Sequence, residues 1–124
     1  MQSNAKTVTY AAIFGWVLSD FRKKRGKSQG EVAAYLDMAQ SGLSNIEKGL
    51  LPMTTNHLAR FADYFDVNPS FILQEVEEML EQCDLHGTTV TFDRPPRVGA
   101  KKKQFLLGAA LGAFLYTVMR SNDS

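Results

Sequence analysis

Residues 28–49, SQGEVAAYLDMAQSGLSNIEKG, constrain the fold more than any other segment, because they predict two short helices joined by a tight turn. Ser28 and Glu31 have the spacing of a capping box: the hydroxyl accepts from an unpaired backbone N–H, and the glutamate reaches back to the cap. A helix should therefore begin near Gln29. Gly49 should lie just past the end of the second helix, where glycine is common.

The second helix is expected to have an apolar side and a polar side. Leu43 and Ile46 are three residues apart and share one face. The polar face carries four short hydrogen-bonding side chains: Gln40, Ser41, Ser44 and Asn45. Gln and Asn amides match the N6 and N7 edge of adenine in the major groove, and Ser suits several bases or a phosphate. The pattern is that of a helix-turn-helix motif, although a solvated helix also carries polar residues without binding anything.

Residues 10–73 resemble the lambda-repressor-like, or Xre-type, helix-turn-helix family. The resemblance implies an all-α domain of five helices, followed here by a linker, with the third helix as the recognition helix. It also implies that Gln40, Ser41 and Asn45 contact base edges, with Ser44 on the same face, and that Gln29 contacts a phosphate. The matching residues are Arg22, Gln29, Glu31, Ala33, Leu36, Leu43, Ile46, Glu47 and Gly49, followed by Pro52, Leu58, Ala62 and Val67.

Charged residues complete the predicted DNA-binding surface. The family's structural ion pair falls on Arg22 and Glu47. Lys24, Lys27 and Lys48 are predicted to contact the DNA backbone together with Gln29. A basic run between the first two helices is also often only a solvated face. Because the chain has a net charge of only +1, binding should depend on a local positive edge and on a dimer.

Three positions depart from the family pattern. Asp37 occupies a turn position that usually holds Gly and often needs a positive φ, which Asp tolerates. Gly42 should weaken the recognition helix by about 1 kcal/mol relative to Ala. Leu50 and Leu51 replace basic residues, so this apolar tip is expected either to bind a partner or to pack on the fourth helix.

The remaining helices of the domain follow from apolar spacing and caps. A helical pattern covers residues 9–24, and Thr54 or Thr55 can cap the next helix. Asn68 and Pro69 read as the N-cap and first position of another helix. Its apolar residues are expected to be core: Phe71, Ile72, Val76, Met79 and Leu80.

The chain changes character after Cys83. We expect the helix-turn-helix domain to span residues 1–83 and a linker or arm to span 84–104, since Gly and Pro recur there. Within the linker, residues 88–92 have strand propensity and could pair with their copy in a dimer. Lys101, Lys102 and Lys103 form a basic run before the final segment.

Residues 105–119 are predicted to form an apolar helix without a polar face, which must be buried in protein or in lipid. The helix would be roughly 22 Å long, short of a hydrocarbon core of about 30 Å. Gly108 and Gly112 form a G-x-x-x-G pattern that brings two helices close. Two readings remain: an anchor in the inner membrane with the lysines on the cytoplasmic side, or a dimerisation helix.

We therefore expect a cytoplasmic, sequence-specific regulator that binds double-stranded DNA as a homodimer and represses transcription. Alternatives are a membrane-anchored adaptor that binds a protein partner, or an antitoxin-like regulator. One Cys suits a reducing compartment, and no secretory signal is recognisable. His57 and His86 are isolated and no catalytic motif is present, so neither an enzyme nor a metal or other cofactor is expected.

Overall fold

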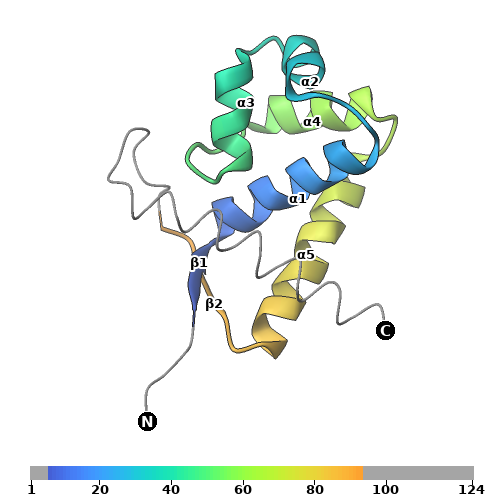
Figure 1. The fold of residues 1–124 in the computed structure, drawn as a ribbon. Helices are drawn as coiled ribbons and strands as arrows, with labels where there is room; N and C mark the ends of the chain where they lie inside the picture. The colour runs from blue at the N-terminus through green and yellow to red at the C-terminus, as the bar shows by residue number, and fades with distance from the viewer. Residues whose placement is uncertain (1–5, 94–124) are drawn as a thin grey trace.

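Five helices and two short strands make up the part of the chain that the computed structural model describes, residues 6–93 (Figure 1). The predictions for residues 94–124, including Gly108 and Gly112, lie outside it. In chain order the elements are β1 (Thr7–Thr9), α1 (Tyr10–Lys24), α2 (Gln29–Tyr35), α3 (Gln40–Glu47), α4 (Thr55–Tyr64), α5 (Pro69–Leu85) and β2 (Thr89–Thr91). None of the five helices is long and apolar enough to cross a membrane.

The helices begin where the sequence places their caps. Thr9 caps α1 by accepting from the Ala12 N–H at 3.1 Å, and Thr54 rather than Thr55 caps α4. Ser28 and Glu31 form the complete capping box at the start of α2. Asn68 precedes Pro69 at the start of α5 as expected, although its side chain makes no capping hydrogen bond.

Helix α1 lies at the centre of the domain, packed against α3 on one side and α5 on the other (Figure 1). Its residues Ile13, Leu18 and Phe21 are almost completely buried, because they recur at helical spacing and α3, α4 and α5 cover them. The prediction that Phe71 belongs to the core is wrong. Phe71 is 41% exposed, since it packs edge-on against Phe21, with ring centroids 6.0 Å apart, and leaves its other side in solvent.

The two strands form a parallel pair within one chain, with Thr7, Val8 and Thr9 opposite Thr89, Val90 and Thr91. Residues 84–91, which the sequence assigned to a linker, therefore comprise the last two residues of α5, a turn and the strand β2. The strand predicted at 88–92 is present at Thr89–Thr91, and it pairs with β1 of the same chain. Sequence analysis missed β1, because a three-residue strand is too short to show an alternating pattern.

Candidate nucleic-acid interface

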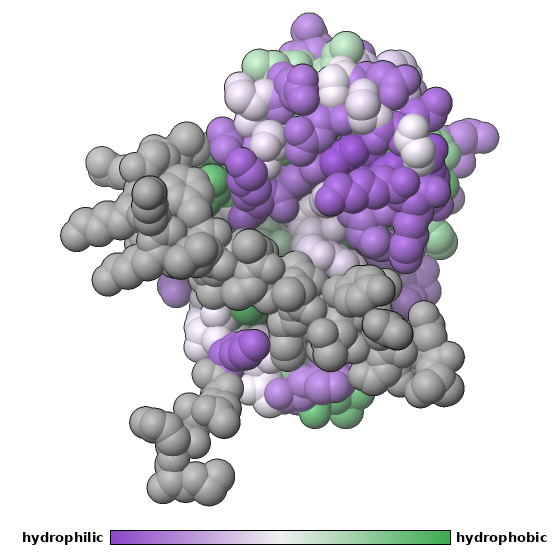
Figure 2. Space-filling model, in the orientation of Figure 1, coloured by the Kyte–Doolittle hydropathy of each residue, from purple (hydrophilic) through white to green (hydrophobic). Residues whose placement is uncertain are grey.

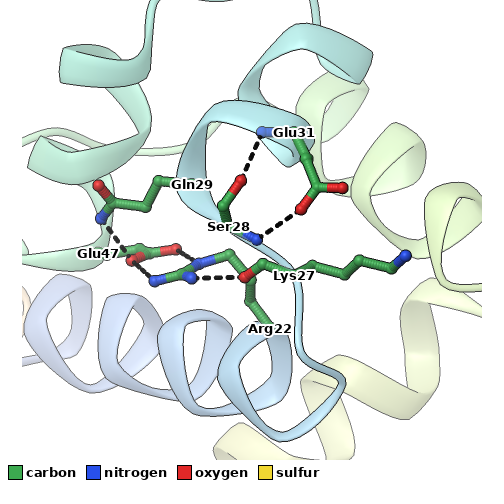
Figure 3. Close-up of polar contacts among 6 residues, drawn as sticks. All are labelled: Arg22, Lys27, Ser28, Gln29, Glu31 and Glu47. Carbon is green, nitrogen blue, oxygen red and sulfur yellow. Dashed lines mark hydrogen bonds and ion pairs between the residues drawn. The ribbon is translucent and has the colours of Figure 1, made fainter.

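The start of α2 is fixed by its capping box (Figure 3). The Glu31 N–H donates to the Ser28 hydroxyl at 3.1 Å, and the Ser28 N–H donates to Glu31 Oε1 at 3.0 Å. Hydrogen bonds to the Glu31 carboxylate from the Ser28 backbone and side chain lower the pKa of Glu31 below its ordinary value. The box therefore holds the first turn of α2 in place while leaving it exposed to solvent.

The turn between α2 and α3 depends on Asp37. Its φ is +57°, which confirms the positive φ expected where the family carries Gly. The Asp37 and Met38 N–H groups donate to Ala34 O and Ala33 O at 3.1 and 3.0 Å. These bonds close the last turn of α2 and direct the chain into α3.

Helix α3 is amphipathic in the way the sequence predicted. Leu43 and Ile46 are buried in the core. Opposite them is the polar face of α3, which we define as Gln40 and Ser41, both exposed, and Ser44 and Asn45, both half-buried. The four side chains share one helix, so a single partner surface could meet all of them.

The polar face of α3 continues onto the start of α2. The Gln40 side-chain oxygen lies 3.5 Å from the point that a Cβ on Gly30 would occupy, and Ser28 Oγ lies 3.9 Å from the same point. Glycine at position 30 therefore leaves room for Gln40 beside the first turn of α2. That turn presents backbone N–H groups without helical acceptors, an arrangement that suits an anion.

An ion pair between Arg22 and Glu47 joins the end of α1 to the end of α3 (Figure 3). Arg22 Nε donates to Glu47 Oε2 at 2.8 Å, and Nη2 donates to Oε1 at 2.9 Å. A third bond, from Nη1 to the Lys27 carbonyl at 2.7 Å, fixes the chain entering α2. The Arg22 and Glu47 side chains are 8% and 4% exposed. They therefore hold α1 and α3 together and are not available to DNA.

Gln29 is held by the same carboxylate. Its Nε2 donates to Glu47 Oε1 at 2.9 Å, which commits one of the two amide hydrogens and leaves the side chain half-buried. Gln29 therefore lies where the first turn of α2 meets the end of α3. A phosphate there could accept from its backbone N–H or from the second amide hydrogen.

The predicted backbone-contacting lysines do not form one surface. Lys27 and Lys48 are exposed at the start of α2 and the end of α3. Lys24 instead pairs with Asp20 at 3.0 Å and lines a groove between α1 and α5 together with Glu75 and Glu78. Those carboxylates would repel a phosphate. The structure therefore argues against Lys24 as a phosphate ligand.

Arg25, which directly follows Lys24 in the basic run at residues 22–27, also makes its contacts within the domain. Its guanidinium lies 3.3 Å from the centre of the Phe21 ring, and Nη1 donates to the Phe21 carbonyl at 3.2 Å. It covers an exposed edge of the aromatic cluster through a cation–π contact. The basic run is therefore divided between the interior and two different surfaces.

The apolar tip after α3 is smaller than expected. Leu50 is buried, at 5% exposure, whereas Leu51 is 37% exposed. The Leu50 and Leu51 N–H groups both donate to Asn45 O, at 2.8 and 3.3 Å, which closes the end of α3. The prediction that Leu50 offers a partner surface is wrong, because this closure turns its side chain into the domain.

Two features of this region went unnoticed in the sequence. A Cβ on Gly15 would lie 2.2 Å from the Ile46 carbonyl oxygen, so glycine is what lets α1 approach α3. The Tyr35 hydroxyl donates to Asp63 across α2 and α4, and this bond raises the pKa of Tyr35. An isolated Gly inside a helical pattern was the available signal for Gly15, and no pattern in the sequence pointed to the bond between Tyr35 and Asp63.

Comparison with known proteins agrees with this arrangement. Residues 18–72 match a family model described as helix-turn-helix. This confirms the lambda-repressor-like, Xre-type family predicted from the sequence: residues 18–72 are a helix-turn-helix domain of that family. Among residues 6–93, no group of three or more His, Cys, Asp or Glu side chains is placed to hold a metal ion.

One solved structure with a similar fold is the clp gene regulator ClgR from Corynebacterium glutamicum. The TM-score is 0.53 at 21% sequence identity, and the match covers 62% of this chain and 86% of that chain. At this identity the similarity concerns the fold. The chain matches none of the curated proteins with which it was compared.

Proposed function

We propose that this protein is a sequence-specific, DNA-binding transcriptional regulator, and that it acts as a dimeric repressor. The observation that carries the proposal is the continuous polar surface formed by the polar face of α3 and the first turn of α2. Its base-reading part is α3, which is narrow enough to enter the major groove of B-DNA. The structurally similar ClgR is also a gene regulator.

Gln40 and Asn45 are the proposed specificity residues, since each amide can donate to and accept from one adenine. A well-formed bidentate pair contributes about 1–3 kcal/mol of discrimination against the wrong base. Ser41 and Ser44 add single hydrogen bonds to bases or phosphates. The side chain of Gln40 is exposed and lies beside Gly30 at the start of α2.

Phosphate contacts are proposed for the first turn of α2 and for the exposed lysines beside it. Lys27 and Gln29 lie at the start of α2, and Lys48 lies at the end of α3. Three such contacts give modest affinity, because each phosphate neutralised by a cation contributes through release of counterions. A dimer on two half-sites one helical turn apart would supply the remaining affinity.

The proposal is tested with Gln40→Ala combined with Asn45→Ala. Both side chains lie outside the core, so the double variant should keep its circular dichroism spectrum and its unfolding midpoint while losing operator specificity. The operator is first identified by a genome-wide DNA pull-down with the intact protein. Gln74→Ala with Gln82→Ala, which removes two amides from α5, is the matched control and should bind normally.

A different behaviour is expected for Lys48→Ala. Loss of one phosphate contact should weaken binding to all sequences alike and reduce the slope of affinity against salt by about 1. If the pull-down enriches no site, or if the Gln40 and Asn45 double variant binds its operator as well as the control, α3 does not read DNA. The polar face would then belong to a protein partner.

A further inference from the structure

A shallow groove lies at the end of the domain formed by the C-terminal part of α5 and by β2. Its volume is about 500 Å³, and Leu80, Val90 and Phe92 supply its apolar lining. Figure 2 shows hydrophobic surface at the lower edge of the molecule, where α5 ends in Figure 1. Phe92 of the lining is 83% exposed, and Leu85, the last residue of α5, is 75% exposed.

Phe92 is nevertheless held in place. Its ring stacks on Tyr10, with centroids 5.6 Å apart and planes at 28°. The ring therefore presents one face to the start of α1 and the other to solvent. A positioned aromatic face of this kind, beside an apolar groove, suits an apolar partner.

The charges around the groove exclude nucleic acid as the occupant. Asp84 is the charged residue of the lining. Helix α5 carries five acidic residues and no basic one, at positions Glu75, Glu77, Glu78, Glu81 and Asp84. A phosphate backbone would be repelled by this helix, whereas a segment that joins apolar and cationic residues would be attracted.

We propose that this groove binds the apolar segment 105–119 of the same chain. That segment contains apolar residues throughout and is preceded directly by Lys101, Lys102 and Lys103. Its apolar side chains would enter the groove, while the lysines would lie along the acidic side of α5. One continuous stretch of the chain thus matches both the apolar and the acidic part of this surface.

The chain is long enough for this return. Residues 94–104 separate β2 and Phe92 from the apolar segment, and eleven residues span up to about 40 Å when extended. Helix α5, with 17 residues, is about 25 Å long. The segment can therefore reach any part of the groove and of α5 from the point where Phe92 leaves the domain.

A single thiol in the segment tests the proposal in the full-length chain. Leu111→Cys places a cysteine in the middle of the apolar segment, and the native Cys83 is completely buried, so it gives a low background. In native buffer, the reaction of this thiol with a water-soluble maleimide should be roughly tenfold slower than the reaction of free cysteine, as for any site that reacts only after local opening. This docking does not depend on DNA binding.

The groove variant is Thr89→Glu, which puts a charge on an exposed residue of the lining. In the Leu111→Cys background it should return the thiol to rapid reaction. Thr91→Glu is the matched control, because it places the same charge on the same strand outside the lining, and it should leave the thiol protected. Urea unfolding of both variants verifies that the domain stays folded.

A charge swap tests the lysine run independently. Lys102→Glu should increase the reaction rate of the thiol, and adding Glu81→Lys should restore protection. If the thiol of the Leu111→Cys variant reacts rapidly with the maleimide while the groove carries no substitution, the proposal is overturned. Protection that rises with protein concentration identifies a second copy as the occupant, and protection that appears only with vesicles of phosphatidylglycerol identifies a lipid surface. Either result also overturns it.

Discussion

The Glu47 carboxylate is the point at which α1, α2 and α3 are joined. Its two oxygens accept from Arg22 and from Gln29, and it lies almost out of contact with water. A buried charge is expensive to leave unpaired, whereas an exposed pair contributes little. This one residue therefore fixes the geometry between the first turn of α2 and the end of α3.

We predict that Glu47→Ala lowers the free energy of unfolding by roughly 3–5 kcal/mol, because it leaves the Arg22 guanidinium buried without its partner. Replacing both charges, with Arg22→Met and Glu47→Leu, should cost clearly less than the single change. The measurement is urea unfolding. Asp20→Ala, which removes the exposed ion pair with Lys24, is the control and should change stability by less than about 1 kcal/mol. A double variant as unstable as the single one would contradict this account.

Glu31 predicts a pH dependence of the α2 cap. Its pKa is lowered in the folded state below 4.5 by hydrogen bonds from Ser28. Its contribution to stability is therefore complete above the unfolded-state pKa and disappears as the pH falls through the folded-state pKa. The stability difference between the wild type and Glu31→Gln should be constant near neutral pH and shrink below about pH 4. Urea unfolding across this pH range measures the stability difference. A difference that does not change with pH would contradict the prediction.

At the scale of elements, two glycines have opposite roles in the packing and stability of α3. Gly15 lets α1 touch the backbone of α3, since an added Cβ would meet Ile46 O at 2.2 Å and Glu47 O at 2.7 Å. Gly42, inside α3, has open space: the nearest atom to an added Cβ is Met38 Sδ, at 3.9 Å. The first glycine is required by packing, and the second only weakens its helix.

The same substitution should therefore have opposite signs at these two positions. Gly15→Ala is expected to destabilise the domain by about 1–3 kcal/mol, because α1 and α3 must move apart. Gly42→Ala is expected to stabilise it by up to about 1 kcal/mol, which is the difference in helix propensity. Thermal and urea unfolding of the two variants make the comparison. Equal effects of the two changes would show that the α1–α3 contact yields easily.

On the scale of the whole molecule, the parallel pair of β1 and β2 joins the start of the domain to its end. The two strands are separated by all five helices in the sequence and still form hydrogen-bonded neighbours. Val8 of β1 is buried in the main core, and Cys83 near the end of α5 is buried in the same cluster. The folded unit therefore extends beyond the matched helix-turn-helix segment on both sides.

Val8→Ala tests this extension. It removes two buried methyl groups and should lower the free energy of unfolding of the whole domain by about 1.5–2 kcal/mol. Thr7→Ala, a neighbouring exposed position on the same strand, should have almost no effect. Urea unfolding followed by circular dichroism reports on the helices, so a loss of helical stability from a strand variant would demonstrate the coupling. No change would mean that the strands are held independently.

The sequence by itself determined the features that depend on neighbours along the chain. These are the capping box at Ser28, the positive φ at Asp37, and the amphipathic pattern that buries Leu43 and exposes Gln40. Local backbone preferences and helical spacing set all of them. The same pattern also predicted the helix-turn-helix family.

Only the tertiary structure decided which surface each side chain reaches. It turned Leu50 inward, left Phe71 half in solvent, directed Lys24 toward α5, and paired β1 with β2. These outcomes depend on contacts between residues far apart in the sequence, and no local preference encodes such contacts. The order of helices can therefore be read along the chain, whereas the boundary and charge of the candidate DNA-binding surface arise from how those helices pack.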